Sequence, residues 1–355
     1  MIPLDDDVKG VILSILSLNE LKLAGNCERV RHGRDGLVFR LTAESQDRRP
    51  FVAVMKLYRG VDGATRVLRE ATLQSALTDS GYPTAAVLHH GHLGHDQPWS
   101  YLLMAEVPGQ PLLGRIGEPG GGDLFRLGSS GVLHELRSIV LTPRLLADAQ
   151  LKLHTISAAP VLRELRSHGV VLPDARSRLA TIREKARSVP VPVLLDALTW
   201  LDPRIDSAEP DVVCHGDIQP LNLVMDSRLI LRGVVDWTWA TVGERALDVG
   251  FTFAALRTVP VSASAMPDLA VRGLQTWFSN DYLRSYASFC PVSRERVDVF
   301  AVLRASSALA SVRLRQRGQL DEPDAVWCSD KGIQRLTAFI AEKIYRGAPA
   351  PRNRN

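Results

Sequence analysis

Two short polar loops, each next to apolar runs with β propensity, restrict the fold of this chain more than any other feature. The first loop, residues 215–222, lies between the runs 211–214 and 223–225. The second begins at Asp236, directly after the run 229–235. Short apolar runs bounded by polar residues are typical of buried strands. The pattern therefore predicts a strand–loop framework that presents polar side chains from two loops.

Those loops supply a carboxylate, an amide and a second carboxylate. Asp217 and Asn222 are five residues apart, and Asp236 lies fourteen residues beyond Asn222. Phosphoryl transfer from a nucleotide needs such groups, because one carboxylate orients a hydroxyl and accepts its proton while the other two groups hold Mg²⁺. Protein kinases place an Asp and an Asn at the same spacing in their catalytic loop, followed by a metal-binding Asp. The spacing predicts a kinase.

Composition sets the size and class of the protein. A chain of 355 residues is expected to form two lobes, since single cores stop growing beyond roughly 250–300 residues. The net charge of +4 comes from dispersed basic residues and predicts no nucleic-acid partner. The four cysteines are far apart, which favours a reducing cytoplasm over a disulfide framework or zinc site. The apolar run 11–18 is too short to cross a membrane, and no signal peptide is predicted.

The first hundred residues have the pattern of a small sheet with one helix. Pro108 and Gly109 end this part of the pattern. A strand hairpin is predicted over 28–40, strands over 49–58, 84–90 and 101–107, and a helix over 63–77.

Beyond Pro111 the pattern is mainly helical, and Asp174 is predicted to cap a helix over 174–187. We therefore predict an α+β, bilobal fold with a small β-rich N-lobe and a larger, mainly helical C-lobe, and a ligand in the cleft between them. The predicted boundaries are 1–107 for a nucleotide-binding lobe (1–27 being an N-terminal extension or helix), 108–347 for a catalytic and acceptor-binding lobe, and 348–355 for a disordered tail.

The motifs together resemble the aminoglycoside phosphotransferase / choline kinase family, the small-molecule branch of the protein-kinase-like fold. His215-Gly216-Asp217 and Asn222 match the family's H-G-D-x-x-x-x-N loop at every defined position. Val235-Asp236-Trp237 matches its hydrophobic-Asp-Trp metal motif. The resemblance runs from about residue 28 to residue 310 and implies a bilobal protein-kinase-like fold.

By this resemblance, Asp217 is the catalytic base, and Asn222 and Asp236 are oxygen ligands to Mg²⁺. His215 is expected to support the loop through a hydrogen bond rather than to take part in the chemistry. Asp248 resembles a carboxylate that braces the catalytic loop.

The segment that carries Asp248 departs from the family pattern at one position. Residues 243–248 resemble the G-x-P-x-x-D segment, but Arg245 replaces the usual proline and leaves the local turn geometry open. Leu153 and His154 resemble a Leu-His pair in a helix of the second lobe and are expected to pack in its core.

The nucleotide-binding side of the resemblance centres on Lys56. This lysine lies within an apolar run, 52–57, where a cation is costly unless it is paired. It resembles the strand lysine that contacts the α- and β-phosphates, and Glu70 in the following helix resembles its ion-pair partner. Arg66, four residues before Glu70, is the alternative partner for that carboxylate.

Two further segments are candidates for contacts with the nucleotide. Gly33 and Gly36 lie where a phosphate-covering loop is expected, although an ordinary hairpin turn fits their spacing equally well. Residues 102–109 resemble the hinge between the lobes, where adenine would pair with main-chain groups around Ala105 and Val107 while Met104 packs nearby.

A cluster of four histidines and one tryptophan lie outside these motifs. His89, His90, His92 and His95 fit no defined set of metal ligands, and we predict a solvated turn over 91–98. Trp239 is a candidate for stacking on a sugar ring of the acceptor.

The resulting hypothesis is an ATP-dependent (or GTP-dependent) kinase that acts with Mg²⁺ on a hydroxyl of a small molecule. The acceptor is an antibiotic such as an aminoglycoside, or a sugar or amino-alcohol metabolite. Residues 238–244 and 281–298, the candidate acceptor region, carry both signs of charge and so do not predict a cationic substrate. No membrane partner and no particular oligomeric state are predicted.

Two alternatives are a protein kinase and an inactive nucleotide-binding protein. No D-F-G or A-P-E segment is present, which argues against a protein kinase. Retention of Lys56, Asp217, Asn222 and Asp236 argues against an inactive protein.

Overall fold

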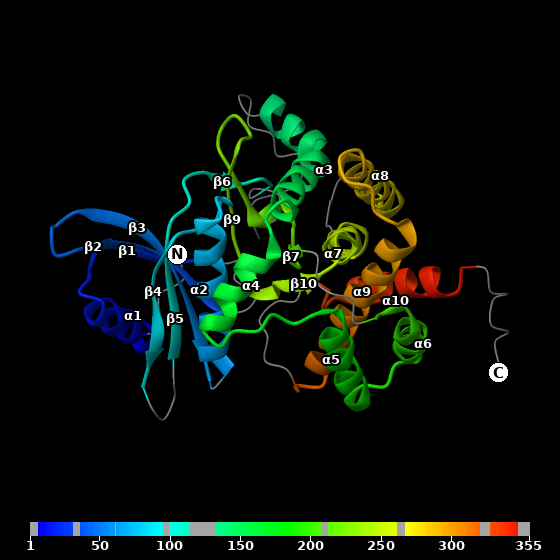
Figure 1. The fold of residues 1–355 in the computed structure, drawn as a ribbon, viewed down its shortest axis with the longest axis horizontal. Helices are drawn as coiled ribbons and strands as arrows, with labels where there is room; N and C mark the ends of the chain where they lie inside the picture. The colour runs from blue at the N-terminus through cyan, green and yellow to red at the C-terminus, as the bar shows by residue number, and fades with distance from the viewer. Residues whose placement is uncertain are drawn as a thin grey trace. The chain divides into compact units, whose positions relative to one another are not determined.

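The chain forms two compact units in the computed structural model (Figure 1). The first unit comprises residues 1–109, 159–171 and 231–238, and the second comprises 110–158, 172–230 and 239–355. The predicted disordered tail, 348–355, lies outside the described residues. The structure describes residues 6–30, 36–60, 62–94, 99–113, 132–206, 212–260, 267–319 and 327–346.

An antiparallel sheet with strand order β1-β2-β3-β5-β4 forms the base of the first unit. β1 begins six residues before the predicted strand start at 28, because it is an edge strand whose residues are mostly exposed and lack apolar alternation. β4 extends beyond the predicted 84–90, since residues 91–93 continue to pair with β5. The strands are β1 (Lys22–Val30), β2 (Leu37–Glu44), β3 (Pro50–Arg59), β4 (Val87–Leu93) and β5 (Trp99–Ala105).

One helix covers each face of this sheet. α1 (Asp6–Leu18) buries Ile15 against a cluster that includes Met55 of β3, and α2 (Asp62–Asp79) buries Val67 in a cluster on the other face. Successive side chains of a strand point to opposite faces. Lys56, which follows Met55, therefore points to the α2 face, where Glu70 lies.

A later segment of the chain returns to the first unit and carries Asp236. It contains β9 (Leu231–Val234), and Val234 N donates to Pro83 O at 2.9 Å. Gly233 fits closely under Val107, since a Cβ there would lie 2.8 Å from Val107 Cγ1. The second returning segment, 159–171, includes most of α4 (Ala158–Ser167).

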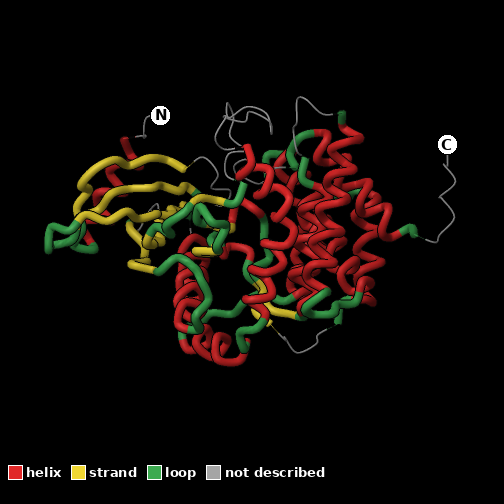
Figure 2. Tube along the Cα trace, turned by 90° about the horizontal axis from the view of Figure 1, so that it is seen from above, coloured by secondary structure: helices red, strands yellow, loops and turns green. Residues whose placement is uncertain are grey.

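The second unit is mainly helical, and Figure 2 shows its helices in red. The α+β fold class predicted from the sequence is thus confirmed. Asp174 is the N-cap of α5, as predicted, and its carboxylate accepts from Ser177 N at 2.7 Å. The helices are α3 (Val132–His154), α5 (Ala175–Ser188), α6 (Pro192–Leu201), α7 (Arg245–Thr258), α8 (Asp268–Ala287), α9 (Arg294–Gln316) and α10 (Asp330–Ile344).

Short strands hold residues 215–222 within the second unit. β7 (Val212–Cys214) pairs with β10 (Thr241–Gly243), and β8 (Leu223–Met225) pairs with β6 (Gln110–Pro111). Residues 215–222 lie between β7 and β8, so both ends of this segment are fixed by strand pairing. Within the described ranges, no helix has the length and apolarity needed to span a bilayer.

Close packing of α7 on α9 leads to the first test. A Cβ at Gly250 would lie 2.7 Å from Val297 O and 2.8 Å from Phe300 Cβ. We expect Gly250→Ala to lower the free energy of unfolding by about 1–3 kcal/mol, because overpacking outweighs the better helix propensity of alanine. Urea denaturation would measure the change.

The matched control is Gly273→Ala in α8, where a Cβ would meet no atom within 4 Å. This change should stabilise the protein by about 0.5–1 kcal/mol. Equal effects at the two glycines would contradict the tight α7–α9 contact.

Candidate active site

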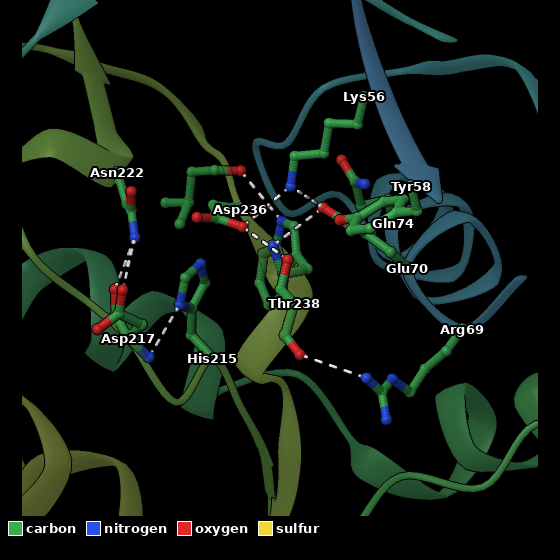
Figure 3. Close-up of polar contacts among 12 residues, drawn as sticks. Lys56, Tyr58, Arg69, Glu70, Gln74, His215, Asp217, Asn222, Asp236 and Thr238 are labelled. Atoms are coloured by element: carbon green, nitrogen blue, oxygen red, sulfur yellow. Dashed lines mark hydrogen bonds and ion pairs between the residues drawn. The ribbon is translucent and has the colours of Figure 1, made fainter. Parts of the chain in front are cut away.

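Lys56 is the centre of a buried charged cluster in the first unit. Its Nζ donates to Glu70 Oε1 at 2.6 Å and to Asp236 Oδ1 at 2.9 Å (Figure 3). Although burial alone would lower it, the carboxylates of Asp236 and Glu70 raise the pKa of Lys56 well above its ordinary value. The structure thus brings together Lys56, Glu70 and Asp236, and the lysine stays charged at neutral pH.

Asp236 has an uncommon backbone conformation, with φ at 69°. Left-handed backbone costs energy for residues other than glycine and persists where the surroundings hold it. Here Asp236 Oδ1 also accepts from Thr238 Oγ1 at 2.8 Å, and Trp237 N donates to Glu70 Oε1 at 3.2 Å. These bonds aim the Asp236 carboxylate at Lys56.

Trp237 anchors this loop to the rest of the first unit. Its ring is fully buried, and Nε1 donates to Thr84 Oγ1 at 2.9 Å and to Val234 O at 3.1 Å. The ring of Tyr82 packs against it edge to face. The tryptophan therefore packs in the core of the first unit and holds the loop that carries Asp236.

Tyr58 joins the charged cluster and was missed in the sequence. Its hydroxyl donates to Glu70 Oε2 at 3.2 Å. Burial raises the pKa of Tyr58 well above the usual range for a phenol, so the hydroxyl remains a donor. The available signal was strand alternation, since residues 56 and 58 share one face of β3.

The Asp217 carboxylate, in the second unit, accepts hydrogen bonds on both oxygens. Arg304 Nη2 donates to Oδ1 at 3.1 Å, and Gln219 Nε2 donates to Oδ2 at 2.9 Å. Asn222 Nδ2 donates to Asp217 O at 2.9 Å and to Oδ2 at 3.3 Å, as Figure 3 shows. Asp217 and Asn222 are thereby held face to face, and both are buried.

Asp248 lies under the loop 215–222 and holds its backbone. Its carboxylate accepts from Gly216 N at 2.8 Å and from His215 N at 3.1 Å, and His154 Nε2 lies 3.2 Å away. Burial alone would raise the pKa of Asp248, but hydrogen bonding and charge from His154 bring that pKa below its ordinary value. His154 therefore belongs to the brace and not to apolar packing alone, because its Nδ1 also lies 2.7 Å from the hydroxyl of Tyr286.

Gly216 and His215 fix the path of the loop. Gly216 has φ at 78°, and a Cβ there would lie 2.1 Å from Trp239 O. Only glycine satisfies both conditions. His215 is fully buried, and its Nδ1 accepts from Asp217 N at 3.2 Å, a contact within the loop itself.

The two remaining nucleotide-side candidates are only partly within the described residues. Gly33 lies outside them. Gly36 has φ at 147°, and a Cβ there would lie 2.8 Å from Leu57 O, so this glycine permits close approach of β3.

At the expected hinge, Ala105 N already donates to Ala86 O at 2.9 Å. That amide is therefore already hydrogen-bonded within the sheet. Val107 follows the end of β5, and its side chain packs over Gly233.

One residue of the histidine cluster differs from its predicted position. His92 was expected in the turn over 91–98 but lies in β4 with His89 and His90, because pairing of β4 with β5 continues to Leu93. His90 and His92 are exposed, and His89 is half-buried. His95 lies outside the described residues.

Arg304 and Gln219 contact Asp217 but were not singled out from the sequence. Arg304 lies in the apolar stretch 297–309 of α9, and its buried guanidinium stacks 4.5 Å from the ring centre of Trp239. The same argument that identified Lys56, a cation within an apolar run, was available for this arginine. Trp239, the candidate for stacking on a sugar, also stacks with Arg178.

The sequence matches a known protein family. The model of the phosphotransferase enzyme family matches residues 26–286. No curated protein matches the chain.

Several solved structures share the fold at low sequence identity. The amicoumacin kinase hAmiN is 11% identical, with a TM-score of 0.58 over 97% of this chain and 96% of that chain. Macrolide 2'-phosphotransferase type I is 17% identical, with a TM-score of 0.55 over 96% of this chain and 99% of that chain. Aminoglycoside-3'-phosphotransferase of type VIII is 18% identical, with a TM-score of 0.54 over 85% of this chain and 98% of that chain. These likenesses show that the chain has the bilobal protein-kinase-like fold predicted from its motifs.

The Asp248 brace provides the second test. We expect Asp248→Asn to destabilise the protein by about 2–3 kcal/mol at pH 7, because an amide cannot replace charge-assisted bonds to two backbone amides and His154. The difference in the free energy of unfolding between wild type and Asp248→Asn should be complete above the ordinary carboxyl pKa of 3.8. It should become smaller as the pH falls through the lower pKa that this carboxyl has in the folded state. Urea denaturation at several pH values would measure it.

Asp79→Asn, at the exposed end of α2, is the control and should change stability by less than about 0.5 kcal/mol. A loss at Asp248 no larger than at Asp79 would contradict the bracing role.

Proposed function

Because the chain belongs to the phosphotransferase enzyme family, we propose that it transfers the γ-phosphoryl group of ATP to a hydroxyl of a small molecule. The observation that best supports the proposal is the buried contact of Lys56 with both Glu70 and Asp236. This cluster keeps a permanent cation beside a carboxylate that is one-quarter exposed. An electropositive lysine next to an accessible carboxylate suits the phosphates of a nucleotide and their metal ion.

In this proposal the nucleotide binds in the first unit. Lys56 would contact the phosphates, and its pair with Glu70 would hold the ammonium in position. Ala105 N and Glu106 N already donate to Ala86 O and Val52 O. The purine would therefore pair with other main-chain groups of this segment, such as those of Val107. GTP has the same phosphates and is the alternative donor.

Asn222 and Asp236 fit the requirements of Mg²⁺. Both offer oxygen atoms, which Mg²⁺ prefers, and few protein ligands suffice when phosphates supply the others. Asn222 uses Nδ2 to hold Asp217, which leaves its Oδ1 as the ligand atom. A bound Mg²⁺ would neutralise charge on the transferring phosphoryl group.

Asp217 is the proposed base. The acceptor hydroxyl oxygen would attack the γ-phosphorus as the bond to the β–γ bridging oxygen breaks. The hydroxyl proton would pass to the Asp217 carboxylate, and ADP would leave.

The amicoumacin kinase and the macrolide and aminoglycoside phosphotransferases are named for antibiotics. We propose an alcohol of that general size, either an antibiotic or a sugar or amino-alcohol metabolite, as the acceptor.

Removing the base is the direct test of the reaction. We expect Asp217→Asn to lower Mg²⁺-dependent phosphorylation of an accepted alcohol by at least about 100-fold, within the usual range for loss of a general base. A nucleotide-consumption screen against aminoglycosides, macrolides, free sugars and choline-like alcohols would first identify that alcohol. Mass spectrometry of the product would then measure turnover.

Glu184→Gln, an exposed change in α5, is the control and should keep wild-type turnover. Wild-type turnover in Asp217→Asn would refute the proposed base. Nucleotide binding without transfer across the whole screen would favour an inactive nucleotide-binding protein.

A second test concerns the metal. Asp236→Asn should raise the Mg²⁺ concentration needed for half-maximal nucleotide turnover by about tenfold or more, because one anionic ligand is lost. Asparagine tolerates left-handed backbone, so the loop should keep its conformation. Titration of turnover with Mg²⁺, together with a circular dichroism melt, would measure both effects. An unchanged Mg²⁺ requirement would rule out Asp236 as a ligand.

A further inference from the structure

Arg304 of α9 forms a buried ion pair with the proposed base. Its Nη2 donates to Asp217 Oδ1 at 3.1 Å, and the two side chains are only 5% and 6% exposed. A guanidinium remains charged whenever the protein is folded, so it compensates the negative charge of Asp217. Arg304 Nε is buried and has no partner, which leaves the bond to Asp217 as the one hydrogen bond of this guanidinium within the described ranges. The polar contact of Arg304 is thus directed at a single atom of the base.

Aromatic rings hold the guanidinium at this position. Its centre lies 4.5 Å from the ring centre of Trp239, 5.5 Å from that of Trp327 and 6.0 Å from that of Phe251. These distances are within the range of cation–π contacts. The side chain also projects from a helix that is mostly buried from Val297 to Leu314. A group on a packed helix has a better defined position than one on a loop, so Arg304 is a rigid point of reference beside the base.

Stability alone does not account for this ion pair. Buried ion pairs often add little to stability, because the cost of removing two charges from water offsets their attraction. Apolar side chains of similar volume can frequently replace such pairs with no loss of stability. The rings around Arg304 already provide the apolar surroundings that such a side chain needs. Arg304 is therefore better explained by its effect on Asp217 than by its contribution to the core.

The hydrogen bonds on Asp217 differ between its two oxygens. Oδ2 accepts from Gln219 Nε2 at 2.9 Å and from Asn222 Nδ2 at 3.3 Å, and both donors belong to the same loop as Asp217. Oδ1 accepts from Arg304 alone among the described residues. The torsion about the Cβ–Cγ bond of an aspartate has a broad minimum, so hydrogen bonds decide how its carboxylate is turned. Donors on Oδ2 alone would let the carboxylate swing about that oxygen, and Arg304 supplies the second fixed point.

Asp248, the other buried anion at this loop, has different partners. Its carboxylate accepts from two consecutive backbone amides of the loop, at 2.8 and 3.1 Å, and His154 Nε2 lies 3.2 Å away. Each of the two anions therefore has partners of its own. The two contacts fix different parts of the base: Asp248 holds the backbone from which Asp217 projects, and Arg304 holds the carboxylate.

We propose that Arg304 is a positioning residue for phosphoryl transfer, which orients the Asp217 carboxylate toward the acceptor hydroxyl. This inference rests on the proposed function of Asp217 as the base. A general base has to lie within hydrogen-bond reach of the proton that it accepts. A displacement of about 1 Å in a reacting group can lower the rate by about 100-fold. Because Arg304 acts through Asp217, its removal should slow the transfer step and leave the binding of both substrates unchanged.

A double-mutant cycle on kcat tests this role. We expect Arg304→Met, which fills similar volume among the rings, to lower kcat by about 10- to 100-fold and to leave the KM of nucleotide and alcohol within about twofold. In an Asp217→Asn background the same substitution should lower kcat by less than about threefold, because no base remains to be oriented. The alcohol is the one identified by the nucleotide-consumption screen, and mass spectrometry of the product would measure turnover of all four proteins.

A direct contact of Arg304 with the substrates predicts a different result. Its removal would then raise the KM of the alcohol or of the nucleotide, and it would lower kcat by the same factor with and without Asp217. Either result would overturn the inference, and so would a wild-type kcat in Arg304→Met.

Arg335→Met in α10 is the matched control. The Arg335 side chain is also 5% exposed and also pairs with a carboxylate, that of Asp268. Its other bonds lead to Val259 and Gln275 and not to the loop 215–222. This variant should lose stability and keep the wild-type kcat, which separates the loss of a buried guanidinium from the loss of orientation at the base.

Arg304→Lys takes the place of Arg304→Met in the cycle where thermal melts show that Arg304→Met does not fold. Lysine keeps a cation beside Asp217 but lacks the planar guanidinium, so its loss of kcat should be smaller. That loss should likewise disappear in the Asp217→Asn background. An equal loss in both backgrounds, or no loss at all, would contradict the positioning role.

Crystal structures of the wild type and of the folded Arg304 variant give a readout that does not depend on turnover. The Asp217 carboxylate should leave its wild-type orientation in the variant, while the backbone of the loop 215–222 stays in place. An unchanged carboxylate would overturn the inference even where the screen finds no accepted alcohol. Wild-type turnover in Asp217→Asn would instead refute the proposed base, whereas a loss there with normal kcat in the Arg304 variant would refute the role of Arg304 alone. The two failures are therefore distinguishable.

Discussion

The loop 215–222, which carries the proposed base, depends on one buried anion, the carboxylate of Asp248. It is fully inaccessible, and it accepts from two consecutive backbone amides of the loop while His154 supports it from α3. Such an anion is stable in a protein interior only when charged and polar groups satisfy it. The left-handed turn at Gly216 brings both amides to the same carboxylate. Remote helices α3 and α7 thereby determine the backbone from which Asp217 projects.

Charge compensation follows the same rule in each of the two units. In the first unit, a buried cation, Lys56, contacts two carboxylates. In the second unit, a buried anion, Asp217, contacts a guanidinium. Each arrangement is complete within its own unit, so each can be preorganised before a ligand binds. Preorganised charges do not have to reorient during the reaction, which is the main way in which proteins stabilise phosphoryl transfer.

The parts that could be predicted from the sequence are those encoded by local pattern. The motif residues Asp217, Asn222 and Asp236 lie within twenty residues of one another, and Lys56 is a cation in an apolar strand. Arg304 was not predicted as the partner of Asp217, because its contact is made 87 residues away by helix packing, which local periodicity does not encode. The start of β1 was predicted at a later residue than the structure has it, because the residues of this edge strand are mostly exposed and show no apolar face. The family match and the shared fold confirm the fold and its class, whereas the role of each site residue stays a prediction.

The position of Arg304 on α9 also affects how readily its contact with Asp217 can change during evolution. Enzymes usually alter their specificity through surface loops, which accept substitutions with little loss of stability. Arg304, which contacts the proposed base Asp217, lies on a helix whose side chains from Val297 to Leu314 are mostly buried. A substitution at Arg304 would alter core packing as well as the contact with Asp217, so this position would change more slowly during evolution than the surface loops.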